Sequence, residues 1–197
     1  MIRIGILGDI GSGKSYVSKS FGYPVFNADE EVGKLYKNDK KIYFKLKKIL
    51  PQFIHTFPIN KKEIINSILH NQTNLKKIIK IIHIEIRKKL KKFLVKNHKS
   101  KFIVLDIPLL LENKLSKKED VLIFVKSKKK DILKRLKKRR NFNKNLIDKF
   151  RKLQLPLDYK IKKSDFIIKN DFTNKSVKKD IKYILKKLIN ERSYIRH

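Results

Sequence analysis

The eight residues from Gly8 to Ser15, which read GDIGSGKS, are the part of the sequence whose residue types and spacing point most directly to chemistry. They match the pattern G-x-x-x-x-G-K-[ST], in which glycines allow the backbone to turn its N–H groups inward around an anion. In such a loop Lys14 reaches the β- and γ-phosphates of a nucleotide, and the hydroxyl of Ser15 is a ligand for Mg²⁺. We therefore predict that a nucleoside triphosphate is bound by Gly11, Ser12, Gly13, Lys14 and Ser15.

Chance does not account for this motif. The chain has six Gly, 44 Lys and 14 Ser plus Thr, and such a composition predicts only about 0.003 matches in a chain of this length.

Two other classes of nucleotide-binding protein lack their signatures here. The stretch Asn174–Val177 lacks the Asp that completes the guanine-recognition motif Asn-Lys-x-Asp, and no apolar run ends in the Asp-Glu pair of ATPase motors. The sequence therefore favours a small-molecule kinase.

The elements that must hold this loop are short apolar strands that alternate with helices. A strand is predicted from Arg3 to Leu7, directly before the loop, and a helix from Tyr16 to Phe21, directly after it. Further apolar runs predict strands at 25–28, 102–105, 121–125 and 166–168. Helical spacing covers 30–50, 61–94 with a break near 71–74, 131–155 and 177–188. This alternation predicts an α/β fold in which helices flank a five-stranded parallel sheet.

Two carboxylates follow predicted strands. Asp29 comes after the strand at 25–28, and Asp106 comes after the strand at 102–105. Ligands of parallel α/β sheets bind at the carboxyl ends of the strands, so both side chains are candidates for contact with a nucleotide, a metal-bound water or an acceptor. The alternative interpretation is local: Asp29 would cap a helix that starts at the next residue, and Asp106 would cap the turn before Pro108.

The net charge of the chain is +34, from 44 Lys and 8 Arg against 18 acidic residues. Such a charge is typical of nucleic-acid binders, but lysine is spread over nearly every segment and the chain has a single alanine. We interpret the charge as a codon-biased, solvated surface that steers anionic substrates. No specific nucleic-acid partner is expected, although the charge is compatible with non-specific polyanion binding in vitro. With no cysteine, no apolar run of about 18 residues and no signal-peptide pattern, we predict a cytoplasmic protein without a membrane segment.

Over most of its length the chain resembles the dephospho-CoA kinase family. That family has a phosphate loop reading GGIGSGKS, here Gly8–Ser15, and a segment Asp-x-Pro-Leu-Leu-x-Glu, here Asp106–Glu112. Only these two motifs are specific by themselves. The remaining motifs support the resemblance because they occur in the same order as in the family. The counterparts of the remaining family motifs are Asn27-Ala28-Asp29, His83–Arg87, Arg135–Arg139, Gln154, Ser164-Asp165 and Ile168–Asn170.

The resemblance implies a P-loop NTPase fold and transfer of the γ-phosphate of ATP to the ribose 3′-hydroxyl of dephospho-CoA. It implies that Asp29 orients and deprotonates that hydroxyl, and that Tyr16 adds to the nucleotide site. Mg²⁺ would be held by Ser15 and, through water, by Asp106. Arg139 would neutralise charge in the transition state, with Arg135 and Arg140 as competitors for that role. The alternative for each of these arginines is a charged side chain in solvent on the surface of a helix.

The resemblance also implies how the chain is divided. We expect a single domain whose core comprises about 1–30, 99–129 and 156–197, with an acceptor-binding helical region at 31–98 and a short lid at 130–155. The acceptor would be bound by Asp29, His83, Arg87, Asp106, Pro108 and Leu109. The alternative is that His83 packs within the apolar stripe of the helix and Arg87 lies beside that stripe. The other histidines show no metal-ligand spacing and are predicted to be structural or surface residues: His55, His70, His98 and His197.

Five positions depart from the family pattern: Asp9, Tyr16, Asn27, Lys61 and Ile84. Asp9 places a negative charge in the phosphate loop, so we expect its side chain to point away from the bound phosphates. Two alternatives stay open beside the implied activity. One is another P-loop kinase, acting on a nucleoside monophosphate or a different small alcohol. The other is a basic nucleic-acid-binding protein with a vestigial phosphate loop.

Overall fold

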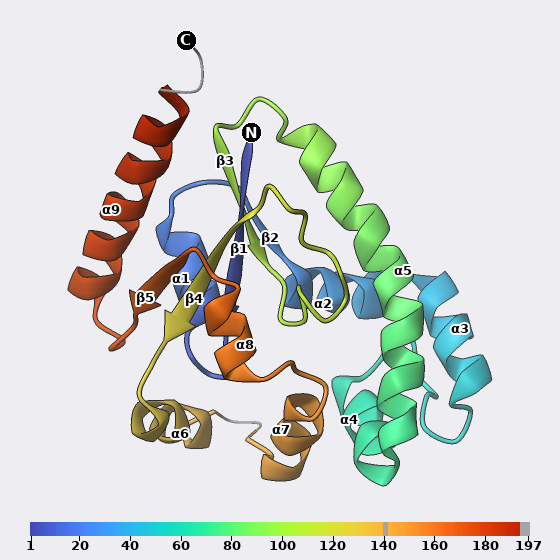
Figure 1. The fold of residues 1–197 in the computed structure, drawn as a ribbon. Coiled ribbons are helices and arrows are strands. Elements are labelled where there is room, and N and C mark those ends of the chain that lie inside the picture. Colours follow the sequence, from blue (N-terminus) through green and yellow to red (C-terminus); the bar gives the residue numbers. More distant parts are fainter. Residues whose placement is uncertain (140–141, 194–197) are drawn as a thin grey trace. The chain divides into compact units, whose positions relative to one another are not determined.

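A computed structural model of the chain describes residues 1–139 and 142–193, with the backbone alone for 191–193. Five strands form one sheet in the order β2-β3-β1-β4-β5, as Figure 1 shows. β1 pairs in parallel with both β3 and β4, and β4 pairs in parallel with β5. The predicted five-stranded parallel sheet is confirmed. Its strands are β1 (Ile2–Gly8), β2 (Val25–Asn27), β3 (Phe102–Asp106), β4 (Val121–Lys126) and β5 (Phe166–Lys169).

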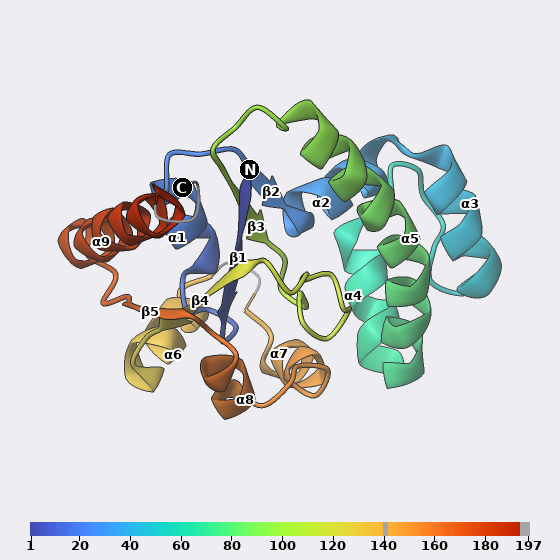
Figure 2. The ribbon, with the colours of Figure 1, turned by 45° about the horizontal axis from the view of Figure 1, so that its top comes forward.

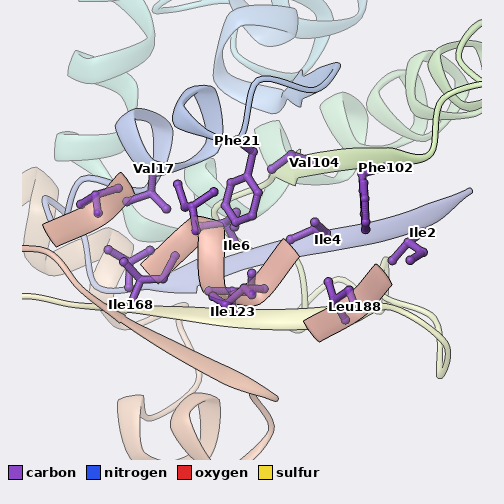
Figure 3. Packing of buried hydrophobic residues seen from close by; sticks show 14 residues of the cluster. Ile2, Ile4, Ile6, Val17, Phe21, Phe102, Val104, Ile123, Ile168 and Leu188 are labelled. Carbon is purple, nitrogen blue, oxygen red and sulfur yellow. The ribbon is translucent and has the colours of Figure 1, made fainter. Parts of the chain in front are cut away.

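One face of the sheet is covered by two helices, α1 (Lys14–Ser20) and α9 (Asn174–Ser193). The inner face of α9 is apolar at positions four, seven and eleven residues after Val177, which is the spacing that keeps one side of a helix on a core. Figure 3 shows these side chains meeting those of the strands. Burying each large aliphatic side chain contributes about 1.5–3 kcal/mol, so this cluster fixes the strand that leads into the phosphate loop.

The opposite face of the sheet is covered by α8 (Leu157–Lys162) and by the turns that follow β3 (Figure 2). Gly5 of β1 lies under Leu110: a Cβ placed on Gly5 would come within 2.6 Å of Leu110 Cδ2. No side chain larger than hydrogen fits there without displacing Leu110. The close approach explains how the segment after Asp106 is held flat on the sheet.

By their internal contacts, the segments form two compact units. Unit 1 comprises Met1–Phe26, Lys99–Phe142 and Gln154–His197, and it contains most of the sheet and the phosphate loop. Unit 2 comprises Asn27–His98 and Asn143–Leu153. Its helices are α2 (Ala28–Asn38), α3 (Lys40–Ile49), α4 (Lys61–His70), α5 (Gln72–Lys96) and α7 (Lys144–Arg151).

The long helix α5 is the centre of unit 2, because α2, α3 and α4 all pack against it. Its predicted apolar stripe is buried at Leu75, Ile78, Ile82, Ile86 and Leu90. Each of these five helices begins after an Asn or Asp whose side chain accepts a hydrogen bond from a backbone N–H of the first turn. Asn71 is one of these caps, and it explains the predicted break near 71–74.

The helical stretch predicted over 131–155 is divided in the structure. The structure has α6 (Lys129–Lys137) and then α7, and α8 begins two residues beyond the predicted end. Asn143 caps α7 by accepting a hydrogen bond from the N–H of Leu146, so a new helix starts there instead of continuing the first. The helical spacing of this basic stretch is real, but side-chain capping divides it.

Candidate active site

The phosphate loop connects β1 to α1 and has a backbone that only glycine adopts easily. Gly11 and Gly13 have φ angles of 87° and 89°, in the left-handed region. A Cβ on Gly13 would also lie 2.3 Å from Asn170 Nδ2. The two glycines are therefore required both by backbone conformation and by close packing, as expected of a loop that turns its N–H groups inward.

Two side chains from other strands hold the loop from behind. Asn170, directly after β5, donates from Nδ2 to the carbonyl oxygen of Ser12 at 2.8 Å, and Ser127, directly after β4, donates from Oγ to the same oxygen at 3.0 Å. Asn170 is 2% exposed, and its Oδ1 accepts from the N–H of Phe172 at 2.9 Å. The Ser12 carbonyl is thus held from two strands, while the Ser12 N–H donates to the Asp9 carbonyl oxygen at 3.2 Å within the loop. Sequence reasoning quoted Asn170 only as part of a family motif and missed Ser127, which no local signal marks.

The variant Asn170→Ala is expected to weaken ATP binding about tenfold, since losing one buried hydrogen bond and leaving the Ser12 carbonyl with one donor fewer costs about 1–3 kcal/mol. The dissociation constant from calorimetry would measure this loss, and urea denaturation would report stability separately. Thr173→Ala is the matched control: its exposed hydroxyl bonds to Asp171 and to Ser176 in the first turn of α9, and neither bond reaches the Ser12 carbonyl. An ATP affinity of Asn170→Ala within twofold of the unaltered protein would contradict a supporting role.

Lys14 and Asp9 both turn onto the loop itself. Lys14 Nζ donates to the carbonyl oxygens of Asp9 at 2.8 Å and Gly8 at 3.3 Å, so the ammonium lies beside the anion-binding backbone. Asp9 Oδ1 accepts from the N–H of Ile10 at 2.6 Å. The carboxylate of Asp9 thus accepts a hydrogen bond from its neighbouring N–H group.

Three further candidate residues belong to unit 1. The exposed Tyr16 donates its hydroxyl to Asn174 Oδ1 at the start of α9. Arg135 of α6 stacks its guanidinium 4.2 Å from the centre of the Phe172 ring. Arg139 is exposed just after α6, and its backbone N–H donates to the Leu136 carbonyl. Arg140 lies outside the described residues, as does His197.

Asp106 is the last residue of β3 and is 3% exposed. The register pairs Leu105 with Gly5, so Asp106 lies at the carboxyl edge of the sheet, next to the strand that enters the phosphate loop. Pro108 and Leu109 are half-buried in the turns that follow. The structure therefore brings Asp106 and the loop to one edge of unit 1, as parallel strands require.

The donors at this edge suit Mg²⁺. Ser15 offers a hydroxyl and Asp106 a carboxylate, and hard cations prefer such oxygen ligands. Across residues 1–139 and 142–193, no group of three His, Cys, Asp or Glu side chains could cage a metal. Mg²⁺ usually keeps several waters and is bound through one or two side chains together with substrate phosphates.

Asp29 is in the first turn of α2, in unit 2, and is exposed. The alternative that Asp29 caps this helix is wrong: the helix begins at Ala28, and Asn27 accepts from the N–H of Glu30 at 2.9 Å. Asn and Asp are equally good caps, which accounts for Asn27 in place of the family's Asp. The predicted strand at 25–28 ends one residue early for the same reason.

His83 and Arg87 lie one turn apart on α5. Burial lowers the pKa of His83, and the nearby positive charge of Arg87 lowers that pKa further. The Arg87 side chain is exposed. Two of the family departures are on the surface nearby: Ile84 is 52% exposed, and Lys61 is the exposed first residue of α4.

A phosphate loop between the first strand and first helix of a five-stranded parallel sheet defines the P-loop class of nucleotide-binding proteins. Within that class, the family model described as dephospho-CoA kinase matches residues 2–176. The chain belongs to the dephospho-CoA kinase family. It is accordingly an ATP-dependent kinase that acts in the final step of coenzyme A biosynthesis.

A known relative supports this family assignment, and two solved structures share the fold. A dephospho-CoA kinase of Wolbachia sp. subsp. Brugia malayi is 33% identical over 190 residues, covering 94% of this chain and 97% of that protein. Among solved structures, TT1252 from Thermus thermophilus has a TM-score of 0.75 at 24% identity, over 95% of this chain and 97% of the other. Dephospho-CoA kinase from Campylobacter jejuni has a TM-score of 0.59 at 22% identity, over 94% and 96%. The two structural likenesses show the fold.

In the part of the chain that the structure describes, no helix combines the length and the apolar character needed to cross a bilayer.

Proposed function

We propose that the chain transfers the γ-phosphate of ATP to the ribose 3′-hydroxyl of dephospho-CoA, in the cytoplasm. The observation that carries this proposal is the preformed phosphate loop, fixed through the Ser12 carbonyl by Asn170 and Ser127 in a chain of this family. A loop so fixed needs little rearrangement when it binds a triphosphate, and preorganised donors are the main source of catalysis in phosphoryl transfer.

The nucleotide is held by the N–H groups from Gly11 to Ser15, and Tyr16 lines the same site from α1. Lys14 exchanges its contacts with the Gly8 and Asp9 carbonyls for the β- and γ-phosphates. Mg²⁺, when bound by Ser15 and through water by Asp106, supplies positive charge to the phosphate oxygens. The chain's own donors then neutralise the charge that grows on the transferred group.

Asp29 acts as the general base. Its carboxylate accepts the proton of the 3′-hydroxyl while the oxygen forms a bond to the γ-phosphorus, and the bond from that phosphorus to the bridging oxygen of ADP breaks. This role is supported by the capping of α2 by Asn27, since the helix does not need the Asp29 side chain as its cap.

The acceptor is bound by two groups of residues. His83 donates a hydrogen bond and Arg87 pairs with the acceptor's phosphate groups, within the acceptor-binding region 31–98. Asp106, Pro108 and Leu109 contact the acceptor from the turns after β3. In the lid segment 130–155, Arg139 neutralises charge in the transition state. Stacking on Phe172 engages Arg135, one of the two competitors for this role.

ATP consumption with Mg²⁺ tests this function, in three parallel reactions: no acceptor, dephospho-CoA, or a nucleoside monophosphate. Turnover that requires dephospho-CoA, with a phosphorylated product confirmed by mass spectrometry, is the expected result. Turnover that requires the monophosphate would replace the acceptor assignment. ATP binding without turnover, together with tight and steeply salt-dependent binding to RNA or DNA, would favour the nucleic-acid-binding alternative.

A further inference from the structure

Two residues of the family-like motifs have no part in the chemistry above: Glu112, which ends the segment after β3, and Gln154, which follows the lid segment. Both contact Lys160 of α8. Lys160 Nζ is 2.8 Å from Glu112 Oε1 and donates to Gln154 Oε1 at 3.3 Å. The side chains of Lys160 and Glu112 are 2% and 9% exposed, so this ion pair is out of water.

The same Glu112 oxygen also accepts a backbone hydrogen bond, from the N–H of Leu155 at 2.9 Å. Gln154 and Leu155 are the first residues of unit 1 after the chain leaves segment Asn143–Leu153 of unit 2. Glu112 itself lies at the far end of the turns that begin after Asp106. The carboxylate of Glu112 therefore connects the segment Asp106–Glu112, here called the loop of Asp106, to Leu155, where the lid segment 130–155 ends.

Stability alone does not explain why these two charges are buried here. Desolvation offsets most of the attraction in a buried ion pair, and uncharged replacements of similar volume are often as stable. Glu112 Oε2 is moreover buried without a hydrogen-bond partner among the described residues, which adds a further cost. The pair instead fixes the position of the Glu112 carboxylate. Its Oε1 atom has two donors at fixed positions, Lys160 Nζ on α8 and the N–H of Leu155.

We infer that Glu112 and Lys160 are positioning residues, which hold the end of the lid segment and the loop of Asp106 in one fixed arrangement. The inference rests on the proposed function, where the lid and the role of Asp106 are stated. The pair acts through the groups it holds: if the Asp106 loop and the lid end shift, the acceptor and the γ-phosphate lose alignment. Misplacement by about 1 Å can cost up to about 10²-fold in rate.

The double variant Glu112→Gln/Lys160→Met tests this inference. It removes both charges at nearly constant volume, and the amide oxygen at position 112 can still accept a hydrogen bond. We expect a thermal midpoint close to that of the unaltered protein, a kcat with dephospho-CoA about tenfold lower, and an unchanged KM for ATP. The ratio of acceptor-independent ATP hydrolysis to transfer should rise about tenfold, because alignment of the acceptor, not of ATP, is lost.

The matched control is Asp120→Asn, which removes a second buried ion pair of unit 1. Asp120 pairs with Arg3 at 2.9 Å, with side chains 2% and 11% exposed, and Arg3 also donates to the Leu115 carbonyl. This pair holds the same connection from β3 to β4, but at the edge where β1 and β4 begin, away from the ligand edge. We expect Asp120→Asn to lower stability and leave kcat and the hydrolysis ratio within twofold.

Amide hydrogen exchange of a peptide spanning 152–156 gives a readout that does not depend on the acceptor. Exchange at Leu155 should be about tenfold faster in the double variant and unchanged in Asp120→Asn. This readout also separates the inference from the function, because a protein that fails to phosphorylate dephospho-CoA still reports on the anchor. If the double variant does not fold, the single variant Glu112→Gln takes its place. A folded variant with kcat and hydrolysis ratio within twofold of the unaltered protein, whatever its exchange, overturns the inference.

Discussion

Asp29→Asn is expected to lower kcat for phosphoryl transfer by about 10²–10⁴-fold, the loss that follows removal of a general base. The amide is close in size to the carboxylate but does not accept the proton of the 3′-hydroxyl. Steady-state kinetics with ATP and dephospho-CoA measure the change. KM for ATP should stay nearly constant, because the proposed nucleotide contacts come from the phosphate loop and not from Asp29.

Loss of stability should not be mistaken for this effect. Asp29 is exposed in the first turn of α2, where removing one negative charge costs about 0.3–1 kcal/mol through the helix dipole. Glu30→Gln is the matched control, since Glu30 is exposed in the same turn and its variant loses the same charge. Glu30→Gln should keep kcat within twofold. A fall of less than about threefold in Asp29→Asn would exclude Asp29 as the base.

The second large effect is expected at Lys14. Lys14→Ala should reduce kcat/KM for ATP by at least about 10²-fold, because it removes a positive charge positioned for the transferred phosphate. In the structure its ammonium donates to the Asp9 and Gly8 carbonyls, and each such hydrogen bond contributes only about 0.5–1.5 kcal/mol to stability. The variant should therefore fold, and calorimetry with ATP together with initial rates would follow the loss.

Lys19→Ala controls for the change in net charge. Lys19 is an exposed residue in the last turn of the same helix, α1, so its loss lowers the net charge of +34 by the same amount without touching the phosphate loop. Its rate and ATP affinity should stay within twofold. Equal losses in Lys14→Ala and Lys19→Ala would show that general electrostatic steering, rather than a contact in the site, sets the affinity.

The sequence determined those features that rest on short-range patterns. The phosphate loop follows from eight consecutive residues, and the strands β1, β3 and β4 follow from apolar runs that only a sheet covered on both faces would bury. The break at Asn71 follows from a side chain that caps a helix locally. Such signals depend on neighbouring residues, so they can be read without knowing the fold. The stretch 131–155 shows the limit, because helical spacing did not reveal the cap at Asn143.

Only the tertiary structure decided which distant groups support the site. Asn170 reaches the Ser12 carbonyl across 158 residues of sequence, Ser127 reaches it across 115, and Glu112 meets the Leu155 N–H across 43. Parallel strands bring these residues together because their carboxyl ends share one edge, and buried polar groups must then find partners there. Which polar groups pair with one another depends on the strand register and the packing at that edge. The separation of two residues along the sequence does not reveal either.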